Sequence, residues 1–138
     1  KARHLDVDMQ RWAKAYGVPF TMNPHFPINT LALMRGAMAM QQRGEEPFQR
    51  YLAAMFSAMF ERPRNLNNPM EIGAVLAEAG FDPMECMQAV QAPAVKEALK
   101  AATAEAVARG VFGVPTFFVG DEMFWGQDRL HFVDAALA

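Results

Sequence analysis

The sequence predicts an α+β fold that is mostly helical and ends in a β-hairpin followed by one more helix. Two observations predict it. Apolar residues recur at helical spacing through most of the stretch 4–109, with breaks at glycine and proline. Only after Gly110 do β-prone aromatic runs occur, PTFFV and EMFWG on either side of GDE, before QDRLHFVDAALA returns to a helical pattern.

The first helix is expected over residues 4–16, and Gly17, placed before Val18-Pro19, ends it. The next segment, VPFTMNPHFPIN, holds three prolines. Each proline removes a backbone donor and disfavours helix in the residue before it. We therefore predict an irregular loop here.

Two longer helices follow. Asn29 is predicted to cap TLALMRGAMAMQQR, which Gly44 ends, and Pro47 falls in the first turn of a helix that runs to about Phe60. This second helix carries a wide apolar stripe that we interpret as core rather than as a ligand site. The stripe consists of Phe48, Tyr51, Leu52, Met55, Phe56, Met59 and Phe60.

Three shorter segments complete the helical part. RPRNLNNP reads as a turn, and MEIGAVLAEAG as a short helix closed by Gly80. Asp82 before Pro83 predicts the N-cap and first residue of another helix. An alanine-rich helix is expected from about Pro93 to Arg109.

Composition excludes several classes of function. The 138 residues carry a net charge of -2, so we expect neither nucleic acid nor anionic lipid as a partner. No apolar run reaches the length of a membrane span, and KARHLDVDMQRW does not resemble a signal peptide, so we expect a cytoplasmic protein. Cys86 is the only cysteine, which excludes an internal disulfide and multi-cysteine metal sites. We interpret Cys86 as a small buried hydrophobe, and we expect no metal site.

The start of the last helix is the first candidate site. A helix N-terminus presents free N–H groups and a positive dipole, so Gln127 and Asp128 could help to hold a carboxylate there. The alternative is that Asp128 only caps the helix. Pro115 could equally be an ordinary trans proline at a strand start. Because two strands do not form a stable sheet alone, we expect partner strands from before Lys1.

Three stretches carry a resemblance to a known family: VFGVPTFFVGDEMFWGQDRL, DVDMQRWAKAYGVPF and NPHFPINTLALMRGA. Together they resemble the 2-hydroxychromene-2-carboxylate isomerase family and the related kappa-class glutathione transferases, over essentially the whole chain. Those proteins have a thioredoxin-like fold, related to the DsbA-type oxidoreductases, with a large helical insertion. The resemblance implies that residues 1–109 are the helical insertion domain and 110–138 the C-terminal ββα part, the N-terminal β-α-β unit being absent.

The resemblance also implies a glutathione site. The Val114-Pro115 bond would be cis, with the backbone of Val114 facing the peptide backbone of glutathione like an added strand. Trp125, Gly126, Gln127 and Asp128 would hold the γ-glutamyl end, with Asp128 pairing to its amino group. The NPHFPIN loop would form a wall of the pocket for a small aromatic substrate. Its implied polar contacts are Asn23, His25 and Asn29, although a lone histidine in such a loop also suits a structural or exposed position.

One departure from the family concerns catalysis. The reactive serine of the family lies in an N-terminal Ser-Pro-type motif, which nothing here matches, since the only serine, Ser57, lies inside a predicted helix. We therefore assign no catalytic residue and expect this truncated chain to be inactive. The resemblance implies a glutathione-dependent isomerase of 2-hydroxychromene-2-carboxylate-type substrates in aromatic catabolism, and a homodimer. A kappa-type glutathione transferase or peroxidase, a DsbA-like disulfide oxidoreductase with an upstream Cys-x-x-Cys, and a noncatalytic helical interaction module remain alternatives.

Overall fold

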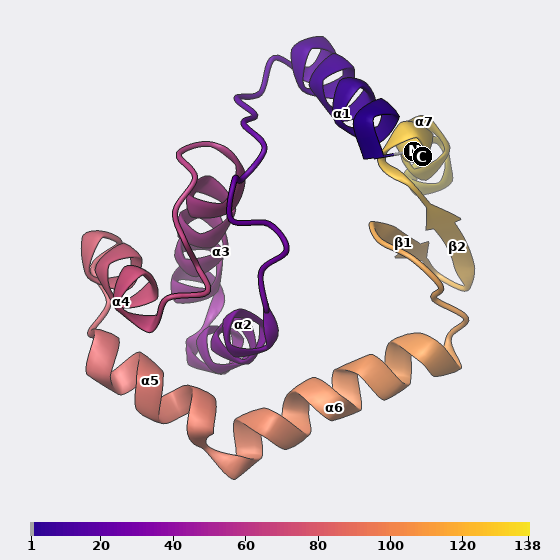
Figure 1. Ribbon diagram of the computed structural model, residues 1–138. Helices are drawn as coiled ribbons and strands as arrows, with labels where there is room; N and C mark the ends of the chain where they lie inside the picture. The colour runs from indigo at the N-terminus through magenta and orange to yellow at the C-terminus, as the bar shows by residue number, and fades with distance from the viewer. Residues whose placement is uncertain (1) are drawn as a thin grey trace. The chain divides into compact units, whose positions relative to one another are not determined.

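The computed structural model describes residues 2–138 and confirms a mostly helical α+β chain that ends in a hairpin and a helix (Figure 1). Its elements in order are α1 (Ala2–Tyr16), α2 (Leu31–Arg43), α3 (Glu45–Phe60), α4 (Pro69–Glu78), α5 (Pro83–Gln91), α6 (Pro93–Ala108), β1 (Thr116–Val119), β2 (Glu122–Trp125), the 3-10 turn η1 (Gln127–Arg129) and α7 (Leu130–Leu137). No helix among the described residues is long and apolar enough to span a membrane.

The chain forms two compact units, Lys1–Leu99 and Lys100–Ala138. The division between them falls inside α6, whereas the predicted domain boundary follows this helix. In the first unit, α2 and α4 each pack against both α3 and α5 (Figure 1). The buried side chains of this group form the core, which consists of Leu33, Ala37, Ala39, Met40, Tyr51, Met55, Ala58, Leu66, Val75, Leu76, Phe81, Cys86 and Val95.

Cys86 is one of these core residues, with 3% of its surface exposed. Desolvation by burial raises the pKa of its thiol above the usual value, and the nearby Arg43 guanidinium offsets part of this effect. A buried thiol with a raised pKa is a poor nucleophile. The interpretation of Cys86 as a small core hydrophobe is therefore confirmed.

In the first unit the predicted helix boundaries hold to within two residues, with a shift at the cap of α2. Asp82 caps α5, because its Oδ1 accepts hydrogen bonds from the Met84 and Glu85 N–H groups at 2.9 and 3.4 Å. Asn68 caps α4 in the same way, accepting from the Met70 N–H at 3.0 Å, a role that the sequence reading had not assigned. At α2 the N-cap position is occupied by Thr30 rather than Asn29. Asn29 still accepts a hydrogen bond from the Leu31 N–H at 3.1 Å, so its side chain stabilises the helix start from one residue further out.

The second unit is built on the predicted hairpin. β1 and β2 pair antiparallel with Thr116 opposite Trp125 and Val119 opposite Glu122, and Gly120 at φ +58° occupies the turn. α7 packs against β1. The Arg109 guanidinium lies 3.5 Å from the centroid of the Phe118 ring, so a cation–π contact joins the end of α6 to the strand.

Candidate functional site

The backbone around Val114 and Pro115 has the predicted conformation, because the bond between them is cis. The Pro115 carbonyl accepts a hydrogen bond from the Gly126 N–H at 3.0 Å, which continues the hairpin pairing beyond Thr116 and Trp125. On the other side, the Thr116 hydroxyl donates to the Gly113 carbonyl at 2.6 Å. Val114 lies between these two anchored residues with 86% of its surface exposed. Its position is therefore held while its surface stays open.

Two glycines allow side chains to approach this backbone closely. A Cβ at Gly113 would lie 2.5 Å from the Trp125 indole nitrogen, so the indole packs directly against the Gly113 main chain. Gly126 has φ +102°, and a Cβ there would lie 2.6 Å from the Asp128 carboxylate. The turn after β2 thus requires glycine both for its backbone conformation and for the position of Asp128.

Asp128 does not cap the last helix, which corrects both the alternative role considered for it and the predicted helix start. Gln127 and Asp128 lie in the 3-10 turn η1, and α7 begins only at Leu130, without a side-chain cap. The Asp128 carboxylate instead pairs with the Arg129 guanidinium at 3.3 Å, each side chain being about half exposed. Arg129 also donates to the Trp125 carbonyl at 2.9 Å.

The second unit therefore brings the six predicted residues of the glutathione site close to one another. Arg129, which had not been predicted, joins them. We call this group the hairpin site: Val114, Pro115, Trp125, Gly126, Gln127, Asp128 and Arg129. The available signal for Arg129 was a basic residue directly after the candidate acid in WGQDRL. Side by side, the carboxylate and the guanidinium complement a ligand end that carries both an ammonium group and a carboxylate.

In the first unit, Asn23 has a structural role rather than the predicted substrate contact. Its side chain is 2% exposed, and both ends of its amide are engaged. Nδ2 donates to the Arg64 carbonyl at 3.0 Å, and Oδ1 accepts from the His25 N–H at 2.9 Å. Because a buried amide is costly unless its hydrogen bonds are made, these bonds account for the asparagine without a ligand.

The other two predicted loop contacts differ from Asn23. The His25 side chain is exposed. Asn29 is exposed too, but its amide oxygen is occupied by the Leu31 N–H. The backbones of both residues are hydrogen-bonded to the Asn67 side chain. Its Oδ1 accepts from the Asn29 N–H at 3.0 Å, and its Nδ2 donates to the His25 and Pro27 carbonyls at 3.5 and 3.3 Å. Asn67 thus fixes the loop, and nothing in its local sequence had indicated that role.

The same loop forms one wall of an apolar pocket of about 240 Å³. Phe26, Ile28 and Thr30 line it from the loop, which also holds a cis Phe26-Pro27 bond. Helices supply the other walls: Leu33, Met34 and Ala37 from α2, and Tyr51, Leu52, Met55, Phe56, Met59 and Phe60 from α3. Among the residues that the structure describes, no charged side chain lines this apolar pocket.

This pocket corrects the interpretation of the α3 stripe as core alone. Tyr51 and Met55 are buried as predicted, but Phe56 is 64% exposed and Phe26 across from α3 in the lining is 58% exposed. Exposed aromatic rings around a hollow are typical of ligand sites, whereas a packed core leaves no such hollow. Most of the stripe therefore lines the pocket, with Tyr51 and Met55 also buried in the core and Phe56 exposed.

A thioredoxin-like hairpin with a cis-proline before its first strand, next in sequence to a helical unit, defines the class of this protein. The DSBA-like thioredoxin domain family matches residues 1–138, and the chain belongs to this family.

Three individual proteins similar to this chain are isomerases of one name. The chain is similar to the 2-hydroxychromene-2-carboxylate isomerases of Sphingobium xenophagum (29% identical, covering 99% of this chain and 68% of that protein) and Pseudomonas putida (31%, 99% and 66%). The isomerase of Pseudomonas sp. (strain C18) is 33% identical, with 99% and 63% covered. A solved structure of selenomethionine 2-hydroxychromene-2-carboxylate isomerase matches with a TM-score of 0.82 at 30% identity, covering 99% of this chain and 65% of the other. The chain thus spans about two thirds of the length of the relatives it matches.

Proposed function

We propose that this chain contributes the helical and C-terminal parts of a glutathione-dependent isomerase of 2-hydroxychromene-2-carboxylate-type substrates in aromatic catabolism. The observation that carries the proposal is the similarity to three isomerases of that name, at 29 to 33% identity over 99% of the chain. The TM-score of 0.82 to a solved isomerase supports it. The hairpin site and the apolar pocket are the parts of the chain that we assign to this function.

The chemistry of the hairpin site fits glutathione. The γ-glutamyl end of the tripeptide carries an ammonium group and a carboxylate, the two charges that Asp128 and Arg129 would pair with at their separation of 3.3 Å. The exposed Val114 would offer its backbone to the rest of the peptide. When bound, glutathione would supply a thiolate that adds reversibly to the substrate and so lets a carbon–carbon bond rotate.

The apolar pocket fits the aromatic part of the proposed substrate. Its aromatic and methionine side chains offer dispersion contacts to a ring, and Met34, Met55 and Met59 are flexible enough to adapt to ring systems of different shape. None of the described residues in its lining is a lysine, arginine or histidine. We therefore assign the ring of the substrate to this pocket and its carboxylate to groups outside the pocket.

An isomerase assay tests the proposal. Conversion between the closed chromene and the open-chain benzylidene-pyruvate is followed by absorbance in the purified protein, with and without glutathione. We expect conversion that requires glutathione when this chain is joined to an N-terminal β-α-β unit with the Ser-Pro-type motif of the family, and no conversion by the 138-residue chain alone, to which we assign no catalytic residue. Glutathione conjugation or peroxide consumption without isomerisation would favour a kappa-type transferase, and no activity of either kind together with no glutathione binding would contradict the proposal.

A matched pair of variants tests the hairpin site. Asp128→Ala should weaken glutathione binding measured by calorimetry by about 1 kcal/mol, a modest loss because the Asp128 side chain is 46% exposed and water screens its charge. Asp121→Ala, which removes an exposed carboxylate from the hairpin turn of the same unit, is the control and should bind as the unaltered protein does. Equal dissociation constants of the two variants for glutathione would contradict the proposed role of Asp128 in binding it.

A further inference from the structure

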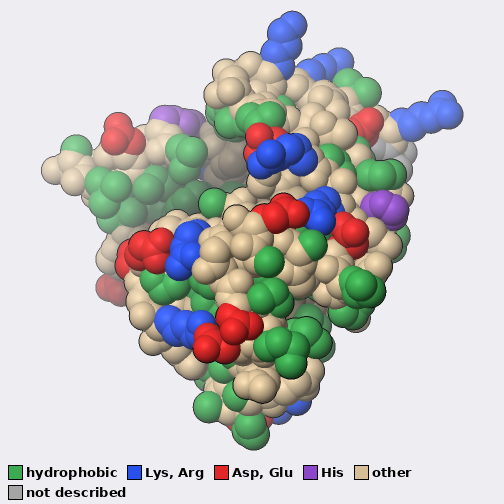
Figure 2. Space-filling model, turned by 90° about the vertical axis from the view of Figure 1, so that its left-hand side faces the viewer, with side chains coloured by type: hydrophobic (Ala, Val, Ile, Leu, Met, Phe, Trp, Pro, Cys, Tyr) green, Lys and Arg blue, Asp and Glu red, His purple; other side chains and the backbone are tan. Residues whose placement is uncertain are grey.

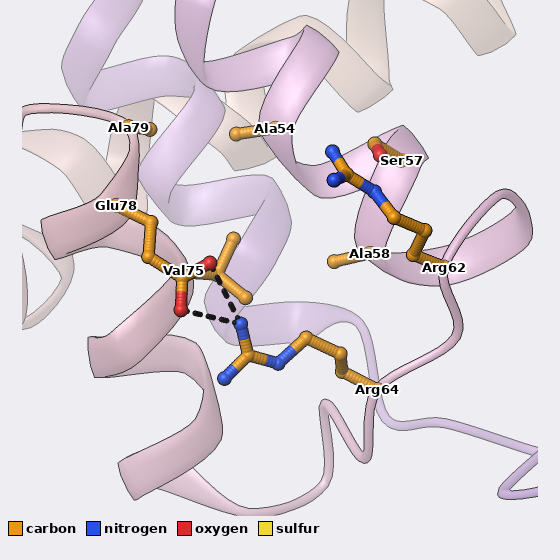
Figure 3. A pocket seen from close by; sticks show the side chains of 8 residues that line it. All are labelled: Ala54, Ser57, Ala58, Arg62, Arg64, Val75, Glu78 and Ala79. Atoms are coloured by element: carbon orange, nitrogen blue, oxygen red, sulfur yellow. Dashed lines mark hydrogen bonds and ion pairs between the residues drawn. The ribbon is translucent and has the colours of Figure 1, made fainter.

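A second cavity, of about 340 Å³, is lined by α3 residues that do not line the apolar pocket (Figure 3). Its lining consists of Ala54, Ser57 and Ala58 of α3, Arg62 and Arg64 of the following loop, and Val75, Glu78 and Ala79 at the end of α4. The α3 residues are three and four positions apart, so they share one helix face. We call this hollow the polar cavity, and neither the fold nor the proposed function accounts for it.

The polar cavity combines an apolar floor with two guanidinium groups. Ala54, Ala58, Val75 and Ala79 supply the apolar surface. Arg64 is paired with two carboxylates, since its Nε donates to Glu71 at 2.9 Å and its Nη1 donates to both carboxylate oxygens of Glu78 at 2.8 and 2.9 Å. Figure 3 shows this pairing at the lower edge of the cavity.

Arg62 differs from Arg64. Its backbone N–H donates to the Ser57 carbonyl at 2.9 Å, but among residues 2–138 no acceptor or carboxylate engages its guanidinium. The side chains of Arg62 and Ser57 line the same cavity, and Ser57 is the only serine of the chain. The polar cavity therefore presents one guanidinium group, that of Arg62, with which none of the described carboxylates pairs, and a hydroxyl lines the same space; Arg64 and its two carboxylate partners beside it carry a formal charge of -1 together.

We propose that the polar cavity binds a small carboxylate with an apolar body. The guanidinium of Arg62 would hold the carboxylate through paired N–H donors, and the Ser57 hydroxyl would donate one further hydrogen bond. The body of the ligand would lie on the alanine and valine floor, in a volume at the lower end of that of small-molecule sites. The site is independent of the hairpin site and does not rest on the proposed function.

The probe is phenylacetate, titrated into the full chain and followed by heteronuclear NMR, with phenylacetamide as its neutral counterpart. We expect phenylacetate to bind at least fivefold more tightly than phenylacetamide and to shift the amide signals of Ser57 and Val75. In Arg62→Gln the dissociation constant for phenylacetate should rise about tenfold. Arg43→Gln removes a similarly exposed arginine outside the cavity and should leave binding unchanged.

A second variant tests the apolar floor separately from the charge. Ala54→Leu fills part of the cavity while keeping Arg62, and it should weaken phenylacetate binding more than the binding of inorganic phosphate. Three outcomes would overturn the proposal: equal affinity for phenylacetate and phenylacetamide, unchanged affinity in Arg62→Gln, or tighter binding of phosphate than of phenylacetate. The first two would exclude a guanidinium-held carboxylate, and the third would indicate a general anion site.

Discussion

The Tyr51 hydroxyl lies in the core of the helical unit and donates its hydrogen bond to the Leu33 carbonyl at 2.8 Å. The side chain is 3% exposed, and its ring meets Phe81 edge-on at 6.2 Å between centroids. The hydroxyl lies against Gly36, where a Cβ would collide with it. The polar atom of a residue in the apolar stripe therefore joins α2 to α3.

Removing this hydroxyl should destabilise the protein. Tyr51→Phe removes the hydrogen bond that the buried hydroxyl adds to the Leu33 carbonyl, which lies inside α2, so we expect the free energy of unfolding to fall by about 1 kcal/mol. Urea denaturation measures this change. Tyr16→Phe, at a side chain 49% exposed, is the control and should change stability far less, because water reaches that hydroxyl. Equal losses in the two variants would contradict the role of the buried bond.

The same residue predicts a pH dependence. Desolvation by burial, aided by Cys86, raises the pKa of Tyr51 well above its usual value of about 10. The unfolded state therefore releases the phenol proton first, and stability that is complete below pH 10 is lost as the pH rises above it. Between pH 10 and pH 11 we expect unaltered protein to lose on the order of 1 kcal/mol more unfolding free energy than Tyr51→Phe. Unfolding free energies are measured by urea denaturation of both proteins between pH 9.5 and pH 11. An equal loss of stability in the two proteins over this range would contradict the prediction.

At the scale of elements, α3 carries three surfaces at once. Its apolar stripe contributes Tyr51 and Met55 to the core and also lines the apolar pocket, and a different face lines the polar cavity. Because an α-helix has 3.6 residues per turn, different residues of α3 face each of these surroundings. The helical period of the sequence alone does not predict which face of α3 is covered by other residues and which borders a cavity.

Two adjacent residues of α3 should therefore respond differently to truncation. Met55→Ala opens a cavity in the core, since Met55 is 7% exposed, and should cost about 2 to 4 kcal/mol of unfolding free energy. Phe56→Ala removes a side chain that is 64% exposed and should cost less than about 1 kcal/mol. Chemical denaturation of both variants measures the difference, and a larger loss for Phe56→Ala would mean that the stripe is core throughout.

For the whole molecule, charge is mixed rather than segregated. The 13 Lys and Arg residues stand against 15 Asp and Glu residues. On the face drawn in Figure 2, acidic and basic side chains lie interspersed among apolar ones. Such a surface creates no extended field of one sign.

We therefore expect no affinity for polyanions. Applied to a heparin or DNA column at low salt, the protein should elute without retention, because binding to such polymers depends on clustered Lys and Arg that release counterions. A basic protein of similar size is the positive control for the column. Retention that weakens steeply with salt would reveal a basic surface and would contradict the charge argument.

The amino-acid sequence was enough to predict the order of helices, the hairpin, the Asp82 cap and the burial of Cys86. These features depend on residues close together in the chain, whose spacing and turn chemistry act locally. The resemblance added the cis Val114-Pro115 bond and the group of residues around it, because those motifs are contiguous.

Features that depend on distant residues appeared only once the chain was folded. Asn23 is structural because it bonds to Arg64, which lies 41 positions further along the chain. Phe56 lines a pocket because the loop across from it leaves a hollow. Sequence spacing specifies which face of an element is apolar, but packing between elements decides whether that face is covered, since coverage depends on residues that the local pattern does not contain.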